Sequence, residues 1–554
     1  MKKIFVLLFL LMSKLVMCQI TSPTQVVPIT PRTLPALHVP FVDADFGTTV
    51  MKIADFTQVA GMTGNIGRSV RQDYAKKNPF NANKTKAVFR VIAQGGWVLY
   101  DATTWTPIRW LNTVQGEPEI EWSPTDPDTL YFIDRIWFKA YHPSTDTYVT
   151  LHAFTQCNFN ADATAAYFAI TDNDEGNLSQ DGKRVAWICQ KSGANDVIVY
   201  DIPSNTVVYE GALPQPFSNI DWLSISPSGK YFVILSNGIY TYDLTGALVG
   251  KETDNYGHAD MGIDPNGDEV IVVDGSNDPH PYLDERWIIK YNLLNYTRTN
   301  LLALPSWSQS NHISLRNTLM PGWTLISTDK STGTSCCNAI NYNVVYPFDS
   351  EVFYLKTDGS GSVQRLAHHR SIRPDYDLGS PIDLNDYWNE THAVPSADGK
   401  SIIFASAWIV NGQPTDLENG GQSSPNAYLI TLGTAPPAPT CIPNGSCSAA
   451  TPACGQTTTG VDSCGNACSK TGPICPACVP NGTCAITAIP QCGLAVSGVN
   501  SCGSACSLTA PACPVCPTCS PSKNYTIKAV TTVTDVATGK VISTATSSAN
   551  VKAP

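Results

Sequence analysis

The sequence has few charged residues and no excess of basic ones. Of its 554 residues, 35 are Lys or Arg and 46 are Asp or Glu, so that 15% are charged and the formal net charge is −11. Proteins that bind nucleic acids need a basic face to neutralise phosphates. The composition therefore argues against a nucleic-acid partner, although a local Arg or His cluster could still bind an anionic substrate.

Long apolar runs are also missing after the N-terminus, where none approaches the ~20 residues that a membrane-spanning helix needs. At the N-terminus, two lysines precede an apolar run from Ile4 to Met12. We interpret residues 1–18 as a signal peptide cleaved ahead of Gln19. Lipid attachment at Cys18 is the alternative, but Met17 stands where a lipobox has a small residue. We expect a secreted, extracellular or cell-surface protein with no transmembrane span.

Turn-forming residues, in contrast, are abundant, with 40 Pro and 39 Gly. Together with the low charge, they favour an all-β exported protein over a helical cytosolic one. A pattern of short apolar strands, a polar turn of the Asp-Gly-Lys type and a strand ending in Tyr-Asp recurs along the chain. Its seven copies are Asn78–Leu111, Glu119–Phe154, Gly176–Leu213, Ile220–Gly250, His258–Leu304, His312–His368 and His392–Leu432.

Repeats of about 40 residues with four short strands each are typical of a β-propeller. We predict a seven-bladed β-propeller over residues 46–432, after a leader at residues 19–45. An isolated strand at Phe46–Asp55 can supply the outer strand of the seventh blade and close the ring, which removes a free edge. Two β-sandwiches are the alternative architecture, which the regular turns disfavour.

The composition changes after the last repeat. A Pro-rich linker at residues 433–440 leads to two Cys-rich repeats at residues 441–520, with a period of 37–38 residues, and to a β-rich tail at residues 521–554. Such short units have almost no core, so we predict that disulfides hold them; zinc is the alternative, although the repeats contain no His. The predicted disulfide cysteines are Cys441, Cys447, Cys454, Cys464, Cys468, Cys475, Cys478, Cys484, Cys492, Cys502, Cys506, Cys513, Cys516 and Cys519.

The adjacent pair Cys336-Cys337 lies in a long insertion of the sixth repeat. These two cysteines can bond to each other, or they can pair elsewhere, for example with Cys157 or Cys189. In either case we interpret them as a loop staple rather than a redox site.

Three histidines, His258, His312 and His392, occupy matching positions in the last three repeats, each seven to ten residues ahead of a turn glycine. If they start the inner strands of blades five to seven, they meet at one mouth of the channel. A purely structural role, in which each histidine bonds to a neighbouring loop, is the alternative. We interpret His368 and His369, near the end of a blade, as surface residues.

Two kinds of chemistry suit this set of residues. Imidazoles together with an amide oxygen from Gln309 or Asn389 can hold a divalent cation, Mn²⁺ or Ca²⁺, which would neutralise a uronate carboxylate. A free imidazole can remove the proton next to that carboxylate while Arg316 stabilises the developing charge. Arg316 could equally be a structural donor. Comparable positions predict substrate contacts at Glu119, Glu121, Trp222 and Tyr387.

The turn motifs, Asn311-His-Ile-Ser-Leu-Arg316 and the strand that follows His392 resemble the oligogalacturonate lyase family and the wider TolB-like propellers. The resemblance covers roughly Phe46–Leu432. It implies a manganese-type ion held by His312 and His392, with Asn389 in the place of the family's glutamine, and His258 as the base. The family has a further histidine two residues after the position of His392, where this chain has Val394.

Two functions are consistent with these patterns. The first is lyase-like β-elimination on a uronate-containing polysaccharide. The second is a non-enzymatic adhesion or structural protein whose propeller binds a polysaccharide or surface glycan. In both cases the C-terminal region would attach the protein to a cell surface or matrix.

Overall fold

The computed structural model divides the chain into two units, Met1–Thr440 and Cys441–Pro554, which are considered separately. Within the first unit it describes residues 20–433 apart from 60, 62–68, 93–95, 116–119, 158–168, 174, 193, 254–255, 276–285, 306–308, 310, 330–345, 372–387, 411–412, 416, 419–421 and 424. Within the second it describes residues 448–453, 456–461, 467–472, 484–486, 494–500, 503–509, 524–534 and 541–552.

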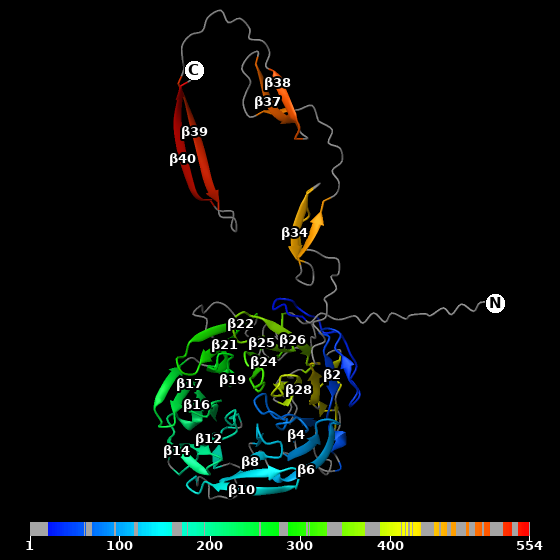
Figure 1. The fold of residues 1–554 in the computed structure, drawn as a ribbon, viewed down its shortest axis with the longest axis vertical. Helices are drawn as coiled ribbons and strands as arrows, with labels where there is room; N and C mark the ends of the chain where they lie inside the picture. Colours follow the sequence, from blue (N-terminus) through cyan, green and yellow to red (C-terminus); the bar gives the residue numbers. More distant parts are fainter. Residues whose placement is uncertain are drawn as a thin grey trace, which may run out of the picture. The chain divides into compact units, whose positions relative to one another are not determined.

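The first unit is a seven-bladed β-propeller, as the repeats predict, and Figure 1 shows the blades following one another around the ring in chain order. Blades 1 to 3 consist of β3 (Ser69–Arg71), β4 (Lys86–Ile92), β5 (Gly96–Asp101) and β6 (Thr106–Gln115); β7 (Ile120–Trp122), β8 (Leu130–Asp134), β9 (Trp137–His142) and β10 (Thr147–Ala153); and β11 (Ile170–Thr171), β12 (Arg184–Cys189), β13 (Asp196–Asp201) and β14 (Thr206–Ala212).

The next three blades have the same antiparallel order, from the inner to the outer strand. They consist of β15 (Trp222–Ile225), β16 (Tyr231–Ser236), β17 (Gly238–Asp243) and β18 (Leu248–Glu252); β19 (Tyr256–Ile263), β20 (Glu269–Gly275), β21 (Arg286–Asn292) and β22 (Arg298–Leu304); and β23 (Asn311–Ser314), β24 (Trp323–Thr328), β25 (Glu351–Lys356) and β26 (Val363–His368).

Blade 7 joins the two ends of the ring. It contains β27 (Val394–Pro395), β28 (Ser401–Ser406) and β33 (Asn426–Thr431), to which the N-terminal β2 (Thr49–Lys52) and β1 (Phe41–Val42) are added. β2 pairs antiparallel with β33, with Met51 opposite Leu429. The predicted closing strand is therefore confirmed, and β1 adds a fifth strand that the sequence did not suggest.

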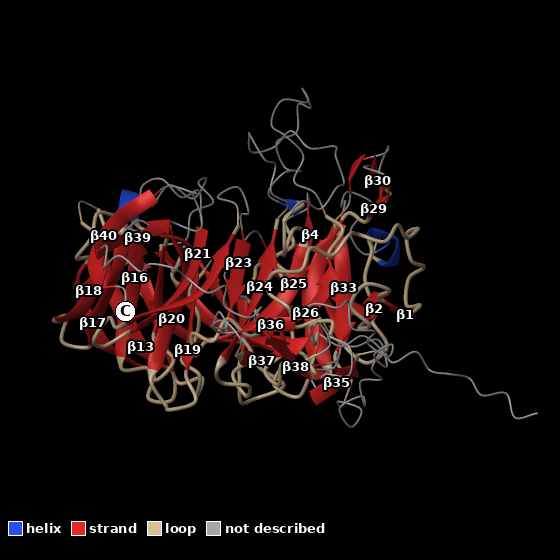
Figure 2. Cartoon of the chain, turned by 90° about the horizontal axis from the view of Figure 1, so that it is seen from above, coloured by secondary structure: helices blue, strands red, loops and turns tan. Residues whose placement is uncertain are grey.

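Burial differs between the strands of a blade in the way that stacked sheets require. The middle strand β13 is buried along its central residues, whereas the outer strand β14 alternates between exposed and half-buried residues. Middle strands face neighbouring blades on both sides and so read as continuous apolar runs. The short turns gather along one side of the ring (Figure 2), and Gly229 in one of them has a φ of 73°, which favours glycine.

Small elements complete the first unit. They are two 3₁₀ turns, η1 (Phe56–Gln58) and η2 (Phe217–Asn219), and two short hairpins in the blade 7 insertion, β29 (Ile409–Val410) with β30 (Gln413–Pro414) and β31 (Leu417–Glu418) with β32 (Gln422–Ser423). None of the helices in the described part of the chain is long and apolar enough to cross a membrane.

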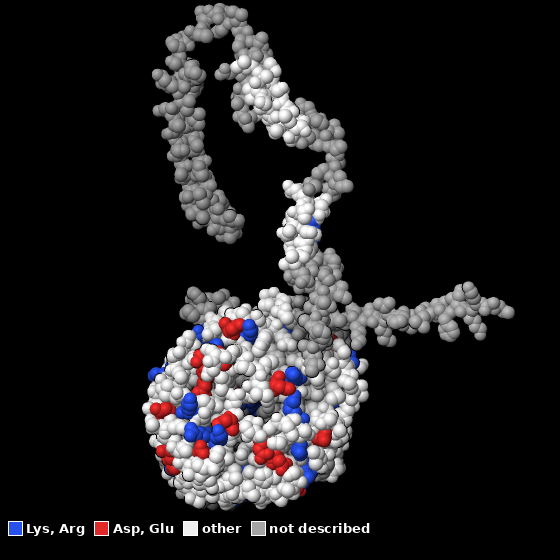
Figure 3. Space-filling view, in the orientation of Figure 1, with Lys and Arg blue, Asp and Glu red and all other residues white. Residues whose placement is uncertain are grey.

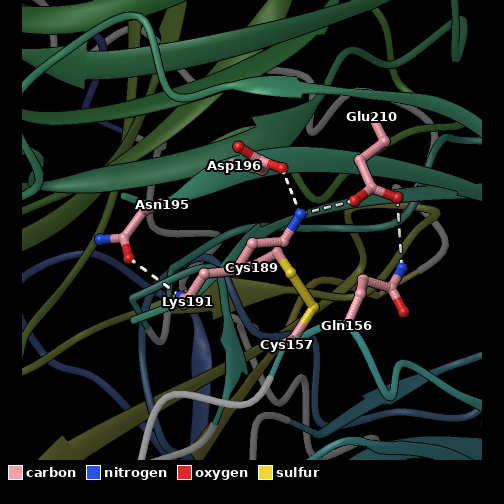
Figure 4. The surroundings of a disulfide bond; sticks show 7 residues. All are labelled: Gln156, Cys157, Cys189, Lys191, Asn195, Asp196 and Glu210. Carbon is pink, nitrogen blue, oxygen red and sulfur yellow. Dashed lines mark hydrogen bonds and ion pairs between the residues drawn. A yellow bond between two sulfur atoms is a disulfide. The ribbon is translucent and has the colours of Figure 1, made fainter. Parts of the chain in front are cut away.

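A disulfide between Cys157 and Cys189 joins the segment after β10 to the end of β12, and so connects blades 2 and 3 (Figure 4). Beside it, the Lys191 ammonium lies 2.7 Å from Glu210 and also pairs with Asp196. The bond excludes the alternative in which Cys157 or Cys189 pairs with the insertion. Cys336 and Cys337 themselves lie outside the described residues.

The segment that follows β3 fills the channel. This segment, Gln72–Lys77, is called the channel strut below. The Gln72 amide donates to the carbonyl oxygens of Thr391 and His392 in blade 7 at 2.9 and 3.0 Å. On the opposite side, Lys76 forms an ion pair with Glu175 of blade 3 at 2.5 Å. The chain therefore crosses its own channel, which the repeat pattern did not predict.

The second unit consists of two-stranded and three-stranded sheets formed by β34 (Thr457–Val461), β35 (Ala467–Thr471), β36 (Cys484–Ile486), β37 (Ala495–Asn500), β38 (Ala505–Thr509), β39 (Asn524–Thr534) and β40 (Val541–Lys552). The two Cys-rich repeats share one register, because Cys468 faces Gly460 and Cys506 faces Gly498. Both of these cysteines are disulfide-bonded. The other predicted disulfide cysteines of the repeats lie outside the described residues, apart from Cys484 in β36.

Candidate metal centre

The three histidines converge inside the channel. His258 lies in β19, His312 lies in β23, and His392 lies just before β27. The ring centroids of His258 and His312 are 4.1 Å apart, and those of His312 and His392 are 4.2 Å apart. Inner strands of adjacent blades thus bring together residues that are 134 positions apart in the sequence.

The Glu390 carboxylate lies between two of these rings. Its Oε2 is 2.9 Å from Nε2 of His312 and 3.1 Å from Nε2 of His392. One ligand atom from each of the three residues lies within 4.8 Å of the others, which is close enough to hold a single metal ion. The structure therefore contains a possible metal-binding group, His312, Glu390 and His392, in which Glu390 is the member that the sequence analysis missed.

The backbone at His392 explains why Glu390 takes part and Val394 does not. His392 has a φ of 42°, in the left-handed region that interrupts the two-residue alternation of an extended strand. Val394 consequently packs into the hydrophobic core with Val70 and Ile403. Glu390 and His392, two residues apart, are the two side chains of this segment that belong to the group. A group of three residues therefore forms without the histidine that the family resemblance implies at position 394.

Burial sets the charges of this group. Burial lowers the pKa of His312 to about 4, and the nearby His392 adds to this shift. Burial also lowers the pKa of His392 to about 4, and the Arg71 guanidinium adds to that shift. Burial alone would raise the pKa of Glu390, but hydrogen bonds from the two imidazoles outweigh it and the pKa is lowered. At neutral pH the group is one carboxylate between two neutral imidazoles, the protonation states in which these side chains bind metals.

The group fits a divalent cation, with one condition on the tautomer of His392. Arg71 Nη2 lies 2.8 Å from its Nδ1, and the Asp73 carbonyl oxygen lies 3.3 Å from the same atom. Arg71 can only donate, so it favours a proton on Nε2, the atom that a cation would need. A bound cation requires the proton to move to Nδ1, where the Asp73 carbonyl can accept it. On His312, Nε2 donates to the Glu390 carboxylate at 2.9 Å and Nδ1 is buried with no partner among the described residues, so the proton on its Nε2 must likewise move before a cation can bind.

His258, the predicted base, lies beside the group rather than in it. Burial and the neighbouring His312 lower its pKa, so the imidazole is neutral at pH 7. Its Nδ1 has no hydrogen-bond partner among the described residues. A neutral imidazole with an unused ring nitrogen is able to accept a proton.

The two predicted amide ligands, Gln309 and Asn389, are both buried. The Gln309 amide donates to the Pro347 carbonyl at 2.9 Å and to the Asp349 carboxylate at 2.8 Å. The backbone carbonyl oxygen of Asn389 accepts a hydrogen bond from the Ser371 hydroxyl at 2.6 Å. Sequence proximity to a histidine was the only signal for either residue, and it did not distinguish them from Glu390.

Arg316 lies four residues beyond His312, about 13 Å further along an extended chain. Its guanidinium binds the Asp260 carboxylate through two hydrogen bonds of 2.8 and 3.1 Å. It also borders an open pocket with Asn177, Gln180 and Trp323 among its walls. Figure 3 shows one face of the ring, where acidic and basic residues intermingle around a central hollow. The hydrogen bonds of Arg316 among the described residues are therefore with Asp260 and the Met261 carbonyl, and none is with a histidine.

Two of the four predicted substrate contacts, Glu121 and Trp222, are among the described residues. Glu121 accepts a hydrogen bond from the Leu178 N–H at 2.8 Å, and burial raises its pKa to about 7 against the effect of Lys77 and Arg316. Trp222 is buried, with the Lys76 ammonium 4.2 Å from its ring centroid. Glu119 and Tyr387 lie outside the described residues.

The surface assignment of His368 and His369 was wrong. Both are 1% exposed, and burial lowers their pKa values to about 3 and about 4. The Thr328 carbonyl lies 2.8 Å from Nε2 of His369. They lie at the end of β26 against the closing N-terminal segment, where the aromatic ring of Phe46 lies 4.9 Å from that of His368.

No family model and no curated protein matches the chain. Solved structures with a similar fold include an oligogalacturonate lyase from Vibrio parahaemolyticus, which is 12% identical over 75% of this chain and all of the other, with a TM-score of 0.46. The WD40 domain of Neurospora crassa Pan2 is 10% identical over 69% of this chain and 95% of its own, with a TM-score of 0.40. These values do not distinguish between functions. What the structure itself establishes is that the chain contains a seven-bladed β-propeller.

Proposed function

We propose that the protein is an exported propeller that binds one divalent cation in its channel and acts as a ligand-binding protein. The observation that carries the proposal is the convergence of His312, Glu390 and His392 on one point. Blade 6 supplies one of these residues and the entry to blade 7 supplies the other two. A cation at this point would join the last two blades.

The donor set favours Mn²⁺ or a similar transition ion over Ca²⁺. Two imidazole nitrogens and one carboxylate oxygen suit Mn²⁺ or Zn²⁺, whereas Ca²⁺ prefers six to eight oxygen ligands. When bound, the ion would supply positive charge that holds Glu390 and stabilises the folded ring. The protein's own groups position the ligands: Gln72 holds the backbone at His392, and Asp73 offers the acceptor for its Nδ1 proton.

Binding is favoured over catalysis because the group is enclosed. His312 is 2% exposed, His392 0% and Glu390 4%. A lyase must bring the carboxylate of its substrate to an open position on the metal. The enclosed group supports a cation with a stabilising role and a ligand that binds elsewhere on the ring.

Export to an oxidising compartment is supported by the disulfides. The propeller contains Cys157–Cys189, and each Cys-rich repeat contains at least one bonded cysteine, Cys468 and Cys506. Disulfides persist in secreted and cell-surface proteins and are rare in the cytosol. We propose a polysaccharide or surface glycan as the ligand, with the disulfide-bonded repeats as a spacer to a cell surface or matrix.

Two measurements test this proposal. Calorimetric titration of the metal-free protein with Mn²⁺ should show one site per chain and a higher melting temperature when the site is filled. A glycan array with and without Mn²⁺ should then show retained glycans. If the protein binds no Mn²⁺, the proposed cation site is wrong. If no glycan on the array is retained, the proposed glycan ligand is wrong.

A lyase is the second candidate, and His258 is the observation that favours it. Its neutral imidazole lies against His312, where it could take a proton from a uronate held by the cation. Incubation with pectic polymers and Mn²⁺, followed by ultraviolet absorbance of the unsaturated product, tests this function. The candidate requires activity in the wild type and its loss in His258→Ala.

A further inference from the structure

The channel strut places an aromatic ring against the proposed cation site. The Tyr74 ring centroid is 4.7 Å from that of His392, 5.4 Å from that of His312 and 6.5 Å from that of His258. Tyr74 is itself only 6% exposed. One side chain therefore contacts all three imidazoles, although it comes from a different blade than any of them.

Polar contacts on both sides of Tyr74 fix the strut in the channel. Before it, the Gln72 amide is bonded to blade 7, as described above. After it, the Ala75 carbonyl accepts a hydrogen bond from the Ser314 hydroxyl of β23 at 2.6 Å. The ammonium group of Lys77 donates to the Gly176 carbonyl and lies 3.6 Å from Asp172. Tyr74 cannot leave the imidazoles unless several buried contacts are broken.

This strut does not have the composition of an ordinary core segment. Lys76 and Lys77 are 2% and 7% exposed, and buried ammonium groups are costly unless they are paired. Apolar residues would fill the channel at lower cost. The lysines are instead placed so that Glu175 and Asp172 anchor the strut across the ring from the histidines.

We propose that Tyr74 is a positioning residue that closes the coordination sphere of the cation. Its ring fills part of the space where further waters or a substrate carboxylate would bind, so the ion keeps its three protein ligands with only one or two waters and exchanges slowly. This inference rests on the proposed cation binding. It adds that release of the ion is limited by movement of the strut, and that the site opens when the Tyr74 ring is removed.

Co²⁺ provides a probe for this proposal, because its visible absorption is stronger with four or five ligands than with six. The full-length wild type loaded with Co²⁺ should absorb strongly and release the ion slowly to excess EDTA. Tyr74→Ala should absorb more weakly as water enters, and should release the ion at least about tenfold faster. Tyr74→Phe keeps the ring and should behave as the wild type.

Tyr141→Ala serves as the matched control. Tyr141 is a buried tyrosine in β9 of blade 2, away from the histidines, so its loss controls for a general loss of stability. The proposal is overturned if Tyr74→Ala keeps the wild-type spectrum and release rate, or if Tyr141→Ala changes both as much. If the wild type binds no Co²⁺ in the first titration, the proposed function fails and this inference fails with it.

Discussion

At one end of the channel, His258 lies beside His312, which contacts the Glu390 carboxylate in a closed cluster. At the other end, Asp260 and Arg316, two and four residues further along the same chain segments, form an ion pair that borders an open pocket. Between the two ends, the Ser314 hydroxyl holds the strut. Alternate residues of an extended strand face the same side, so His312 and Ser314 of β23 both contact the strut, whereas Arg316 lies two residues beyond the end of the strand.

The same two chain segments therefore supply side chains to two sites of different charge. The histidine end holds neutral bases around an ionised carboxylate, which suits a cation. The arginine end holds a saturated ion pair beside Glu121, whose pKa is raised to about 7. The strut divides them, so a ligand at one end does not contact the other. The predictions below test this division, starting with the largest expected effect.

Glu390→Gln should abolish cation binding at the histidine end. The substitution removes the only carboxylate of the group and its charge, while the amide keeps the shape of the side chain. We expect the affinity for Mn²⁺ to fall at least about 100-fold, which is equivalent to about 2.7 kcal/mol. Calorimetric titration measures the change. Retained affinity in this variant would show that the cation binds elsewhere.

Arg71→Gln should instead increase the affinity for Mn²⁺. Its guanidinium lies within hydrogen-bond distance of Nδ1 of His392, where it repels a bound cation and favours the wrong tautomer. Removing a charge about 5 Å from the ion in a partly polar interior should tighten Mn²⁺ binding by about tenfold or more. The same titration measures the gain, and circular dichroism checks that the variant folds. Weaker binding in a folded variant would contradict this account of the tautomer.

The ring could be predicted from the sequence because its signals are local. Tight polar turns, such as Asp181-Gly-Lys183 and Asp398-Gly-Lys400, and alternating strands recur along the chain, so Phe46–Asp55 could be assigned to the seventh blade by its lack of another partner. The histidines could also be placed, because they occupy equivalent positions in consecutive repeats. Each of these features depends on one repeat unit at a time.

Glu390 and the strut could not be predicted because they depend on contacts between distant blades. Glu390 lies beside His392, whose backbone is left-handed and whose carbonyl oxygen accepts a hydrogen bond from the Gln72 amide. Gln72 in turn lies outside the repeated pattern. The same reason applies to Arg316, because its spacing from His312 did not show that its guanidinium pairs with Asp260 of blade 5.

The two ends should contribute opposite pH dependences to stability. The pKa values of His312 and His392 fall from 6.5 to about 4 on folding, so the unfolded chain binds more protons and stability is lost as the pH falls through this range. The pKa of Glu121 rises from 4.5 to about 7, so the folded chain binds more protons and stability is lost as the pH rises through that range. Each group contributes up to about 1.4 kcal/mol per pH unit.

Urea denaturation of the metal-free protein between pH 4.5 and 6.5 measures these slopes. Glu121→Gln should make stability increase more steeply with pH than in the wild type, whereas His312→Gln should make it increase less steeply. Comparison with the wild type cancels the contributions of other groups, such as His368 and His369. Equal slopes in all three proteins would contradict the assigned pKa shifts.

Arg316→Gln should have the smallest effect on the cation. At about 13 Å and the dielectric constant of water, one unit charge contributes about 0.6 kcal/mol to the binding of a divalent ion, so Mn²⁺ affinity should change by less than about threefold. Stability should nevertheless fall by a few kcal/mol, because the buried Asp260 loses its partner. Titration and urea denaturation of the same variant measure the two effects. A large loss of Mn²⁺ affinity without unfolding would show that the strut does not separate the two ends of the channel.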